Sequence, residues 1–254
     1  MESSCQYSPN QEQAIDSQIH HYQQKIGSTL YPATITRPDV ERPVNKLAEF
    51  ITNPSNAHFE AINRVIAYLY STRFYAIEYS ANQESSIKWD NIFICASDAL
   101  FADYHDCKST EGFLCMLYSG LINWKASKQR TVTTSTTEAE LLAISQAAKT
   151  LYWWKRMFNA IKFNPEHDIL IKCDNRQTIE LLTKEEPQLR TKLRHVDIHG
   201  MWLRQEVQNE GIKIEWVPTA EMPADGMTKA LSAQRHQEFI KMLGLTDVKS
   251  LILA

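Results

Sequence analysis

Four short segments of this chain each place one acidic residue at the edge of an apolar run, and this pattern constrains the fold more than any other feature. The acids are Asp98, Glu140, Asp174 and Asp225. They are separated by 42, 34 and 51 residues, so only tertiary folding can bring their side chains together. Crowded carboxylates repel one another and raise one another's pKa unless divalent cations neutralise them. Ligands that offer only oxygen select Mg²⁺ or Mn²⁺ over zinc.

Three of these acids also have a purely structural explanation. Asp98 ends an apolar strand, where aspartate is a common first residue of a turn. Asp174 and Asp225 each lie at the start of a predicted helix, where aspartate is a common N-cap. Asp174 also ends a buried strand, and open α/β sheets place their ligand sites at the carboxyl ends of strands. Four such acids in one domain favour a shared site that binds two metal ions and performs in-line displacement at a phosphodiester.

Two neighbouring glutamates, Glu138 and Glu140, are both candidates for the second acid of the site. Ser135-x-x-Glu138 and Thr137-x-x-Glu140 both satisfy the capping-box pattern of a helix start. One glutamate can support the helix start while the other faces the site. We favour Glu140 as the ligand, because the apolar run 141–143 follows it directly and places it beside the buried stripe of the helix.

Composition sets the broad class. The chain has 254 residues, 43% hydrophobic and 22% charged, which is ordinary for a globular protein. A net charge of −3 means that any contact with nucleic acid must be local. Five cysteines without a C-x-x-C pair indicate reduced thiols. The polar first twenty residues lack a signal-peptide core, and no apolar stretch approaches the ~20 residues of a membrane span. We expect an intracellular protein with no membrane partner.

The pattern along the chain predicts a mixed-sheet α/β layout. Residues 1–20 are expected to be poorly ordered, 21–87 mainly helical, and 88–254 to form an α/β domain with a C-terminal helical tail. A helix over 55–70 and a strand over 75–79 belong to the second region. In the third we expect strands over 91–98, 112–118, 121–125, 168–173 and 213–217, and helices over 137–158, 175–182, 192–209 and parts of 223–243.

Six ordered motifs lie between about Asn91 and Leu231. They are Ser97-Asp98-Ala99, Lys108-Ser109-Thr110-x-Gly112, Ser135-Thr136-Thr137-Glu138-Ala139-Glu140, Cys173-Asp174-Asn175, Thr191-Lys192-x-Arg194-His195-Val196-Asp197-Ile198, and Val217-Pro218-Thr219 through Ala224-Asp225-Gly226-Met227-Thr228-Lys229. In order and spacing they resemble the ribonuclease H domain of copia-type LTR retrotransposon Pol polyproteins. The resemblance implies an α/β, ribonuclease H-like five-stranded mixed sheet flanked by helices.

The same resemblance implies a function. It makes the chain a ribonuclease H that cleaves the RNA strand of RNA–DNA hybrids and uses two Mg²⁺ or Mn²⁺ ions. The family's catalytic, metal-binding acids fall on Asp98, Glu140, Asp174 and Asp225. Cellular enzymes of this superfamily carry a histidine-containing loop before the last acid, whereas residues 217–225 contain no histidine.

The N-terminal part resembles the end of the reverse transcriptase of the same polyproteins. The segments that carry this likeness are 22–31, Thr36-Arg37-Pro38-Asp39 and 53–70. The polymerase signature, an aromatic residue followed by x-Asp-Asp, is absent, so we expect no polymerase activity. The polymerase domain is therefore an expected partner, in a cytoplasmic particle or the nucleus. The alternative is a catalytically silent or co-opted fragment that acts as a structural or interaction module.

Further residues are candidates for contact with the hybrid, and each has an alternative explanation. Residues 124–135 combine one aromatic residue with several cations and hydroxyls, which suits phosphate contacts but equally suits a solvated turn. The candidates are Lys125, Lys128, Arg130, Thr134, Asn175 and Arg194. His195 and His199 have the spacing of a zinc pair but lack a third ligand, so we expect packing or hydrogen bonding. Trp153 and Trp154 are expected in a core or an interface, not in base stacking.

Overall fold

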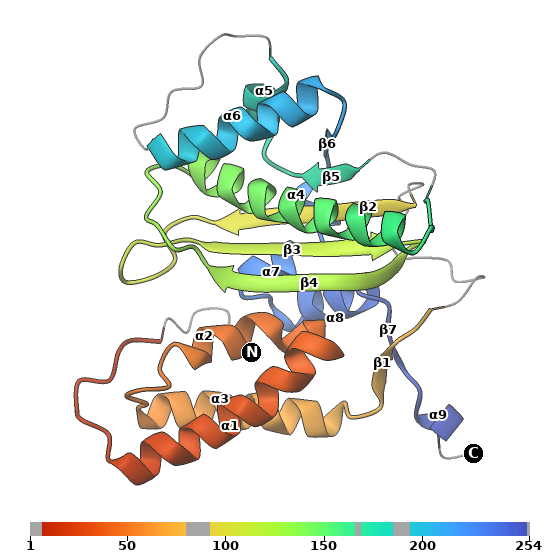
Figure 1. The fold of residues 1–254 in the computed structure, drawn as a ribbon. Helices are drawn as coiled ribbons and strands as arrows, with labels where there is room; N and C mark the ends of the chain where they lie inside the picture. The colour runs from red at the N-terminus through yellow and green to blue at the C-terminus, as the bar shows by residue number, and fades with distance from the viewer. Residues whose placement is uncertain (1–6, 80–91, 166–168, 185–193, 253–254) are drawn as a thin grey trace. The chain divides into compact units, whose positions relative to one another are not determined.

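The chain divides into two compact units in the computed structural model, which describes residues 7–79, 92–165, 169–184 and 194–252 (Figure 1). One unit combines Met1–Ser86 with Ala230–Ala254, and the other is Ile87–Lys229. Within the described ranges, the helices are too short or too polar to cross a membrane. Cys95, Cys107, Cys115 and Cys173 are free thiols.

The Ile87–Lys229 unit contains a five-stranded sheet in the order β4-β3-β2-β5-β6. β2, β3 and β4 form an antiparallel meander, and β5 and β6 continue the sheet parallel to β2. The predicted five-stranded mixed sheet flanked by helices is therefore confirmed. The strands are β2 (Phe93–Leu100), β3 (Thr110–Leu117), β4 (Gly120–Lys128), β5 (Leu170–Cys173) and β6 (Lys213–Trp216). The helices are α4 (Thr136–Ala160), α5 (Arg176–Thr183), α6 (Arg194–Gln208), the 3₁₀ turn η2 (Thr219–Glu221) and α7 (Asp225–Thr228).

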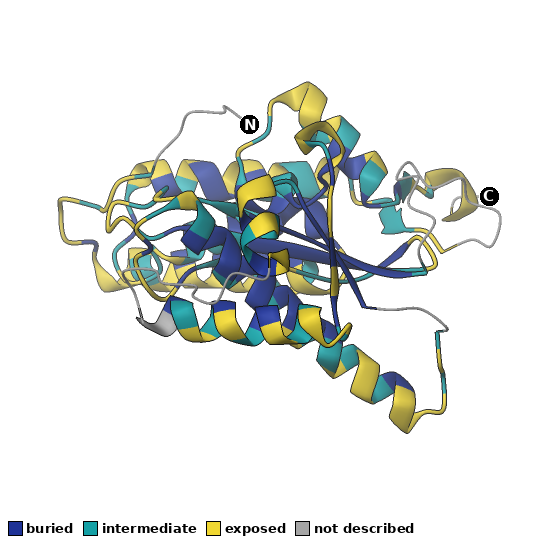
Figure 2. Ribbon diagram, turned by 90° about the horizontal axis from the view of Figure 1, so that it is seen from above, coloured by how far each residue is buried: buried dark blue, intermediate teal, exposed yellow. Residues whose placement is uncertain are grey.

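Alternate residues of β2 pack on opposite faces of the sheet. Phe93 and Cys95 belong to the main core with residues of α4 and α6, whereas Ala96 packs against Val217 and Met222. The sheet is thus covered on both faces, and its central strands β2, β3 and β5 are mostly buried (Figure 2). β5 is buried along its whole length, as its continuous apolar run predicts. Because β2 and β5 are parallel neighbours, their carboxyl ends meet at one edge of the sheet.

The other unit is mainly helical, as predicted for its N-terminal part. It contains α1 (Asp16–Ile35), the 3₁₀ turn η1 (Pro38–Val40), α2 (Glu41–Ala48), α3 (Asn56–Ser71), β1 (Tyr75–Ile77), α8 (Ala233–Met242), β7 (Leu245–Asp247) and α9 (Lys249–Ile252). A core of buried residues from the first three α-helices, which includes Tyr22, Leu47 and Ile62, holds them together.

Two expected boundaries differ from this arrangement. Residues 16–20 are not poorly ordered but form the first turn of α1, where the Gln18 side chain accepts a hydrogen bond of 3.2 Å from the Ile15 N–H. The C-terminal tail does not group with the α/β unit. β7 pairs with β1 in an antiparallel ribbon, and α8 packs on η1, so residues 230–254 join the helical unit.

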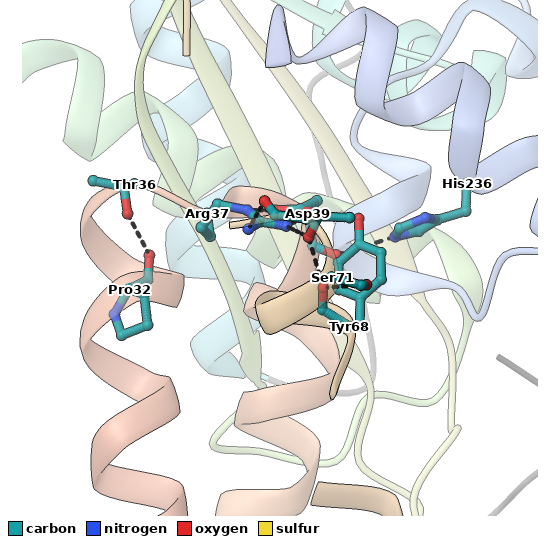
Figure 3. A network of polar contacts seen from close by, with 8 residues as sticks. Pro32, Thr36, Arg37, Asp39, Tyr68, Ser71 and His236 are labelled. Carbon is teal, nitrogen blue, oxygen red and sulfur yellow. Dashed lines mark hydrogen bonds and ion pairs between the residues drawn. The ribbon is translucent and has the colours of Figure 1, made fainter. Parts of the chain in front are cut away.

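A buried ion pair explains the Thr36-Arg37-Pro38-Asp39 motif (Figure 3). Arg37 donates to both carboxylate oxygens of Asp39, at 2.9 and 2.8 Å, and its Nη1 donates to the Thr72 carbonyl at 3.0 Å. The Tyr68 hydroxyl donates to Asp39 at 2.6 Å, and His236 Nε2 lies 3.3 Å from the Asp39 carbonyl oxygen. The motif therefore joins α3 and α8 to η1, which is a structural role.

Candidate active site

Three of the four predicted acids converge at the edge where β2 and β5 end. Asp98 lies near the end of β2, Glu140 lies in the first turns of α4, and Asp174 directly follows β5. Each offers a carboxylate oxygen, and the three oxygens all lie within 4.8 Å of one another. The three acids line one surface hollow with Ala99, Thr136, Asn175, Arg176, Gln177, Trp216 and Lys229. Residues far apart in sequence thus form one acidic cluster.

The fourth acid, Asp225, stands beside this cluster and is not part of it. It is the first residue of α7, and its Oδ1 lies 2.6 Å from Nζ of Lys229. The same Nζ lies 3.3 Å from Oδ1 of Asp98. Lys229 therefore connects Asp225 to the cluster as a shared counter-ion.

The surroundings of the cluster oppose its negative charge. Burial raises the pKa of Asp98 to about 6, although the Lys229 ammonium and the Thr228 hydroxyl favour the ionised form. Burial, followed by the charges of Asp98 and Asp174, raises the pKa of Glu140 well above its ordinary value. Both side chains are almost fully buried, at 1% and 5% exposure. Such a cluster gains stability from any cation that binds it.

One oxygen of Glu140 is an unsatisfied acceptor. Its Oε2 is buried and accepts no hydrogen bond from the residues that the structure describes. A buried polar atom without a partner costs free energy, which a coordinated cation would recover. Three carboxylates whose oxygens lie within 4.8 Å of one another are hard oxygen donors of the kind that Mg²⁺ and Mn²⁺ prefer. The residues present therefore fit a divalent cation.

The two competing glutamates of α4 have different positions. Ser135 is the N-cap residue, and its hydroxyl accepts the Glu138 N–H at 3.2 Å. Oε2 of Glu138 accepts the main-chain N–H and the hydroxyl of Thr134, at 2.6 and 2.8 Å. Glu138 is thus committed to the helix start, whereas Glu140 belongs to the acidic cluster. The structure thus separates the two glutamates, and the role of Glu140 as a metal ligand stays a prediction.

The residues around Asp174 hold it in place without making it a helix cap. Thr219 donates to its Oδ2 at 2.8 Å, and Trp216 Nε1 donates to its main-chain carbonyl at 3.1 Å. The N-cap of α5 is Asn175, whose Oδ1 accepts the Thr178 N–H at 3.1 Å. Asp174 is therefore not the N-cap of α5.

Two residues that contact Asp98 in the folded chain lie in the last sequence motif, but the sequence alone did not indicate a function for them. The Thr228 hydroxyl donates to Oδ2 of Asp98, and Lys229 contacts its Oδ1. Both residues end the last motif, so their place in it was the available signal. Three further residues of the site were not predicted from the sequence, namely Thr219, Arg176 and Trp216. Of these, only Thr219 lies in one of the six motifs.

The predicted nucleic-acid contacts are mostly outside the hollow. Of the six, only Asn175 lines it in the part of the chain that the structure describes. Lys125 and Arg130 are exposed, and Lys128 lies 3.1 Å from the Asp106 carboxylate and over the Tyr104 ring. The Thr134 hydroxyl is bonded to Glu138. The side chain of Arg194 lies outside the described residues.

The histidine and tryptophan candidates have structural roles where the structure describes their side chains. Nδ1 of His199 lies 3.1 Å from the Ser145 hydroxyl, in line with the expected hydrogen bonding, and the His195 side chain lies outside the described residues. Trp154 packs against the main core, and Trp153 is 51% exposed beside it.

A sheet in the order β4-β3-β2-β5-β6, with acids on β2, on α4 and after β5, defines a ribonuclease H-like protein. No protein-family model matches the chain. It is 29% identical over 225 residues to the retrovirus-related Pol polyprotein from transposon TNT 1-94 of Nicotiana tabacum, covering 88% of this chain and 16% of that protein. Over most of its length the chain is thus similar to retrovirus-related Pol polyproteins from copia-type transposons.

Other relatives match different shares of the chain. The Pol polyprotein from transposon RE1 of Arabidopsis thaliana is 29% identical over 228 residues, 89% of this chain and 15% of that protein. The chain thus spans about one sixth of the length of these polyproteins. A protein named secreted RxLR effector protein 161, from Plasmopara viticola, is 35% identical over 133 residues, 52% of this chain and 89% of that protein.

Solved structures with a similar trace include two that contain nucleic acid. LC11-RNase H1 in complex with an RNA/DNA hybrid has a TM-score of 0.40 and 13% identity, covering 54% of this chain and 93% of that chain. The foamy viral protease-reverse transcriptase in complex with an RNA/DNA hybrid has a TM-score of 0.47 and 11% identity. The match covers 79% of this chain and 25% of that chain. The fold assignment rests on the strand order of this chain and not on these likenesses.

Proposed function

We propose that this chain is the ribonuclease H part of a retrotransposon Pol and hydrolyses the RNA strand of RNA–DNA hybrids. The convergence of Asp98, Glu140 and Asp174 within 4.8 Å is the observation that carries the proposal. A cluster of buried acids destabilises the fold, so such clusters are found mainly at functional sites. Oxygen ligands at this edge of the sheet suit metal-assisted hydrolysis of a phosphodiester.

The four acids Asp98, Glu140, Asp174 and Asp225 would hold two Mg²⁺ or Mn²⁺ ions. Bound ions of this kind activate a water molecule and stabilise the leaving oxygen. The chain's own residues prepare the site: Thr228 fixes the carboxylate of Asp98, Thr219 fixes that of Asp174, and burial keeps Glu140 rigid. Lys229 limits the repulsion between Asp98 and Asp225 before any ion arrives.

The substrate assignment follows from the family. An enzyme that cuts only the RNA strand must distinguish 2′-hydroxyl groups, which a hybrid displays in its wide minor groove. We further propose that residues 21–87 are the end of a reverse transcriptase and its connection. A polymerase domain of the same polyprotein would then be the natural partner, bringing the hybrid to the site.

Cleavage of a hybrid with labelled RNA tests the proposal directly. The native chain is incubated with Mg²⁺ or Mn²⁺, alongside Asp174→Asn, and with duplex DNA and duplex RNA as control substrates. We expect shortened RNA with 3′-hydroxyl ends from the hybrid alone, and only with the native chain. Equal cleavage by Asp174→Asn would overturn the site assignment. A folded native chain that leaves the hybrid intact would favour a silent or co-opted fragment.

A further inference from the structure

An arginine and a tryptophan form a stacked pair at the rim of the acidic hollow. Arg176 is the first residue of α5, and Trp216 is the last residue of β6. The guanidinium carbon of Arg176 lies 3.9 Å from the centre of the Trp216 ring. Both side chains line the same hollow as Asp98, Glu140 and Asp174. The pair therefore adjoins the proposed reaction centre.

The tryptophan of this pair is fixed to the acidic cluster. Its Nε1 donates to the main-chain carbonyl of Asp174 at 3.1 Å, while 42% of the residue stays exposed. An indole held in this way offers a ring face at a set distance from Asp174. A guanidinium over that face gains cation–π attraction and loses much of its rotational freedom. Trp216 thus positions Arg176 relative to the acids.

The guanidinium of Arg176 has donors to spare. Among the described residues it makes no hydrogen bond or ion pair, and the nearby Glu180 of the same helix pairs with Lys184 at 2.9 Å. Two other cations of this unit are committed to carboxylates: Lys229 contacts Asp98 and Asp225, and Lys128 pairs with Asp106. A stacked guanidinium keeps its in-plane N–H groups free, in the fork that matches a phosphate.

We propose that Arg176 and Trp216 form a phosphate-binding subsite for the strand that enters the acidic hollow. The inference rests on the proposed function. Arg176 binds a backbone phosphate next to the one that is cut, and Trp216 is the positioning residue that holds Arg176 there. An acidic hollow repels a polyanion, so a cation at its rim lowers the cost of bringing the strand close. A chain with a net charge of −3 needs such local contacts.

Binding of a fluorescent RNA–DNA hybrid without divalent ions tests the subsite apart from cleavage. Affinities of the native chain and Arg176→Ala are compared over a range of salt concentrations. We expect the variant to bind about tenfold more weakly, with a salt slope smaller by about 1. Arg176→Lys should keep the slope but bind less tightly than the native chain, because an ammonium lacks the planar fork.

Two further variants distinguish positioning from base stacking. Trp216→Ala should reproduce the loss seen with Arg176→Ala, and Trp216→Phe, which keeps a ring but not the hydrogen bond to Asp174, should lie between. The matched control is Arg156→Ala, an exposed cation sixteen residues after Glu140 on α4 and hence about 24 Å along the helix. It should bind like the native chain.

The outcomes separate this inference from the proposed function. If the native chain cleaves the hybrid while Arg176→Ala binds it with unchanged affinity and slope, the subsite is wrong and the function stands. If only Trp216→Ala weakens binding, a base stacks on the indole and the phosphate subsite is overturned. A folded native chain that neither binds nor cleaves the hybrid would overturn both.

Discussion

Gly112 of β3 lies so close to Met227 of α7 that a Cβ at Gly112 would stand 2.5 Å from the Cβ of Met227. Gly112 is also the register partner of Asp98 on β2. The missing side chain therefore lets α7 pack directly on the sheet beside Asp98. This close approach brings the Thr228 hydroxyl to the Asp98 carboxylate and Asp225 to its place next to the cluster.

Gly112→Ala should therefore damage the site through α7. The added methyl forces α7 away from β3, which loosens the contact of Thr228 with Asp98. We expect a stability loss of about 1–3 kcal/mol in denaturant unfolding and a clear fall in cleavage rate. Gly27→Ala is the control, because a Cβ added at Gly27 on α1 would meet no other atom within 4 Å. Full activity in Gly112→Ala would contradict the packing role.

Glu140→Gln should reduce cleavage, whereas Glu138→Gln should reduce stability. Glu140→Gln removes a proposed ligand, and we expect cleavage to fall more than about a hundredfold with little loss of stability. Glu138→Gln weakens the bonds to Thr134 at the helix start, so it should cost about 0.5–2 kcal/mol while cleavage largely remains. Rates and thermal melts of the two variants, measured side by side, check this. A reversed pattern would exchange the two roles.

The stability of the metal-free protein should fall as pH rises from about 4 to about 6. Burial raises the pKa of Asp98 from its usual 3.8 to about 6, so in this window the folded state holds a proton that the unfolded state has lost. Stability decreases with pH wherever the folded state binds more protons, here by roughly 1–3 kcal/mol. Urea unfolding at several pH values, with and without Asp98→Asn, measures it. The variant should lack this part of the slope; an identical slope would exclude Asp98 as its source.

Divalent cations should stabilise the folded chain, independently of any cleavage. A ligand at a hundred times its dissociation constant adds about 2.7 kcal/mol. We expect Mg²⁺ or Mn²⁺ to raise the melting temperature of the native chain, and EDTA to reverse the rise. Asp174→Asn should respond far less, because one of the three converging carboxylates is gone. The same rise in both proteins would place cation binding elsewhere.

The buried pair of Arg37 and Asp39 should matter for stability alone. Asp39→Asn leaves a buried guanidinium without its carboxylate, which costs about 3–5 kcal/mol. The exposed pair of Arg235 and Glu238, in the same unit, is the control, and Glu238→Gln should change stability by less than about 1 kcal/mol. Denaturant unfolding compares the two. Equal effects would mean that burial does not set the cost.

Local sequence patterns predicted the elements that carry the site. The apolar run 169–173 predicted a strand buried on both faces, and β5 has that burial. The repeated apolar positions of 137–158 predicted a helix, and α4 covers that range. Both succeeded because burial leaves a periodic mark within a single element. Strand ends and flanking motifs then marked three acids that do converge.

The α/β class, the order of the strands along the chain and the acids at their ends could be predicted from sequence, because these depend on neighbours a few residues apart. Three features could be seen only in the folded chain: the C-terminal tail joins the helical unit, Thr228 contacts Asp98 across 130 residues, and Arg176 stacks on Trp216. Such contacts form between surfaces that approach only after the sheet has assembled. Spacing along the chain carries no record of which side chains will then meet.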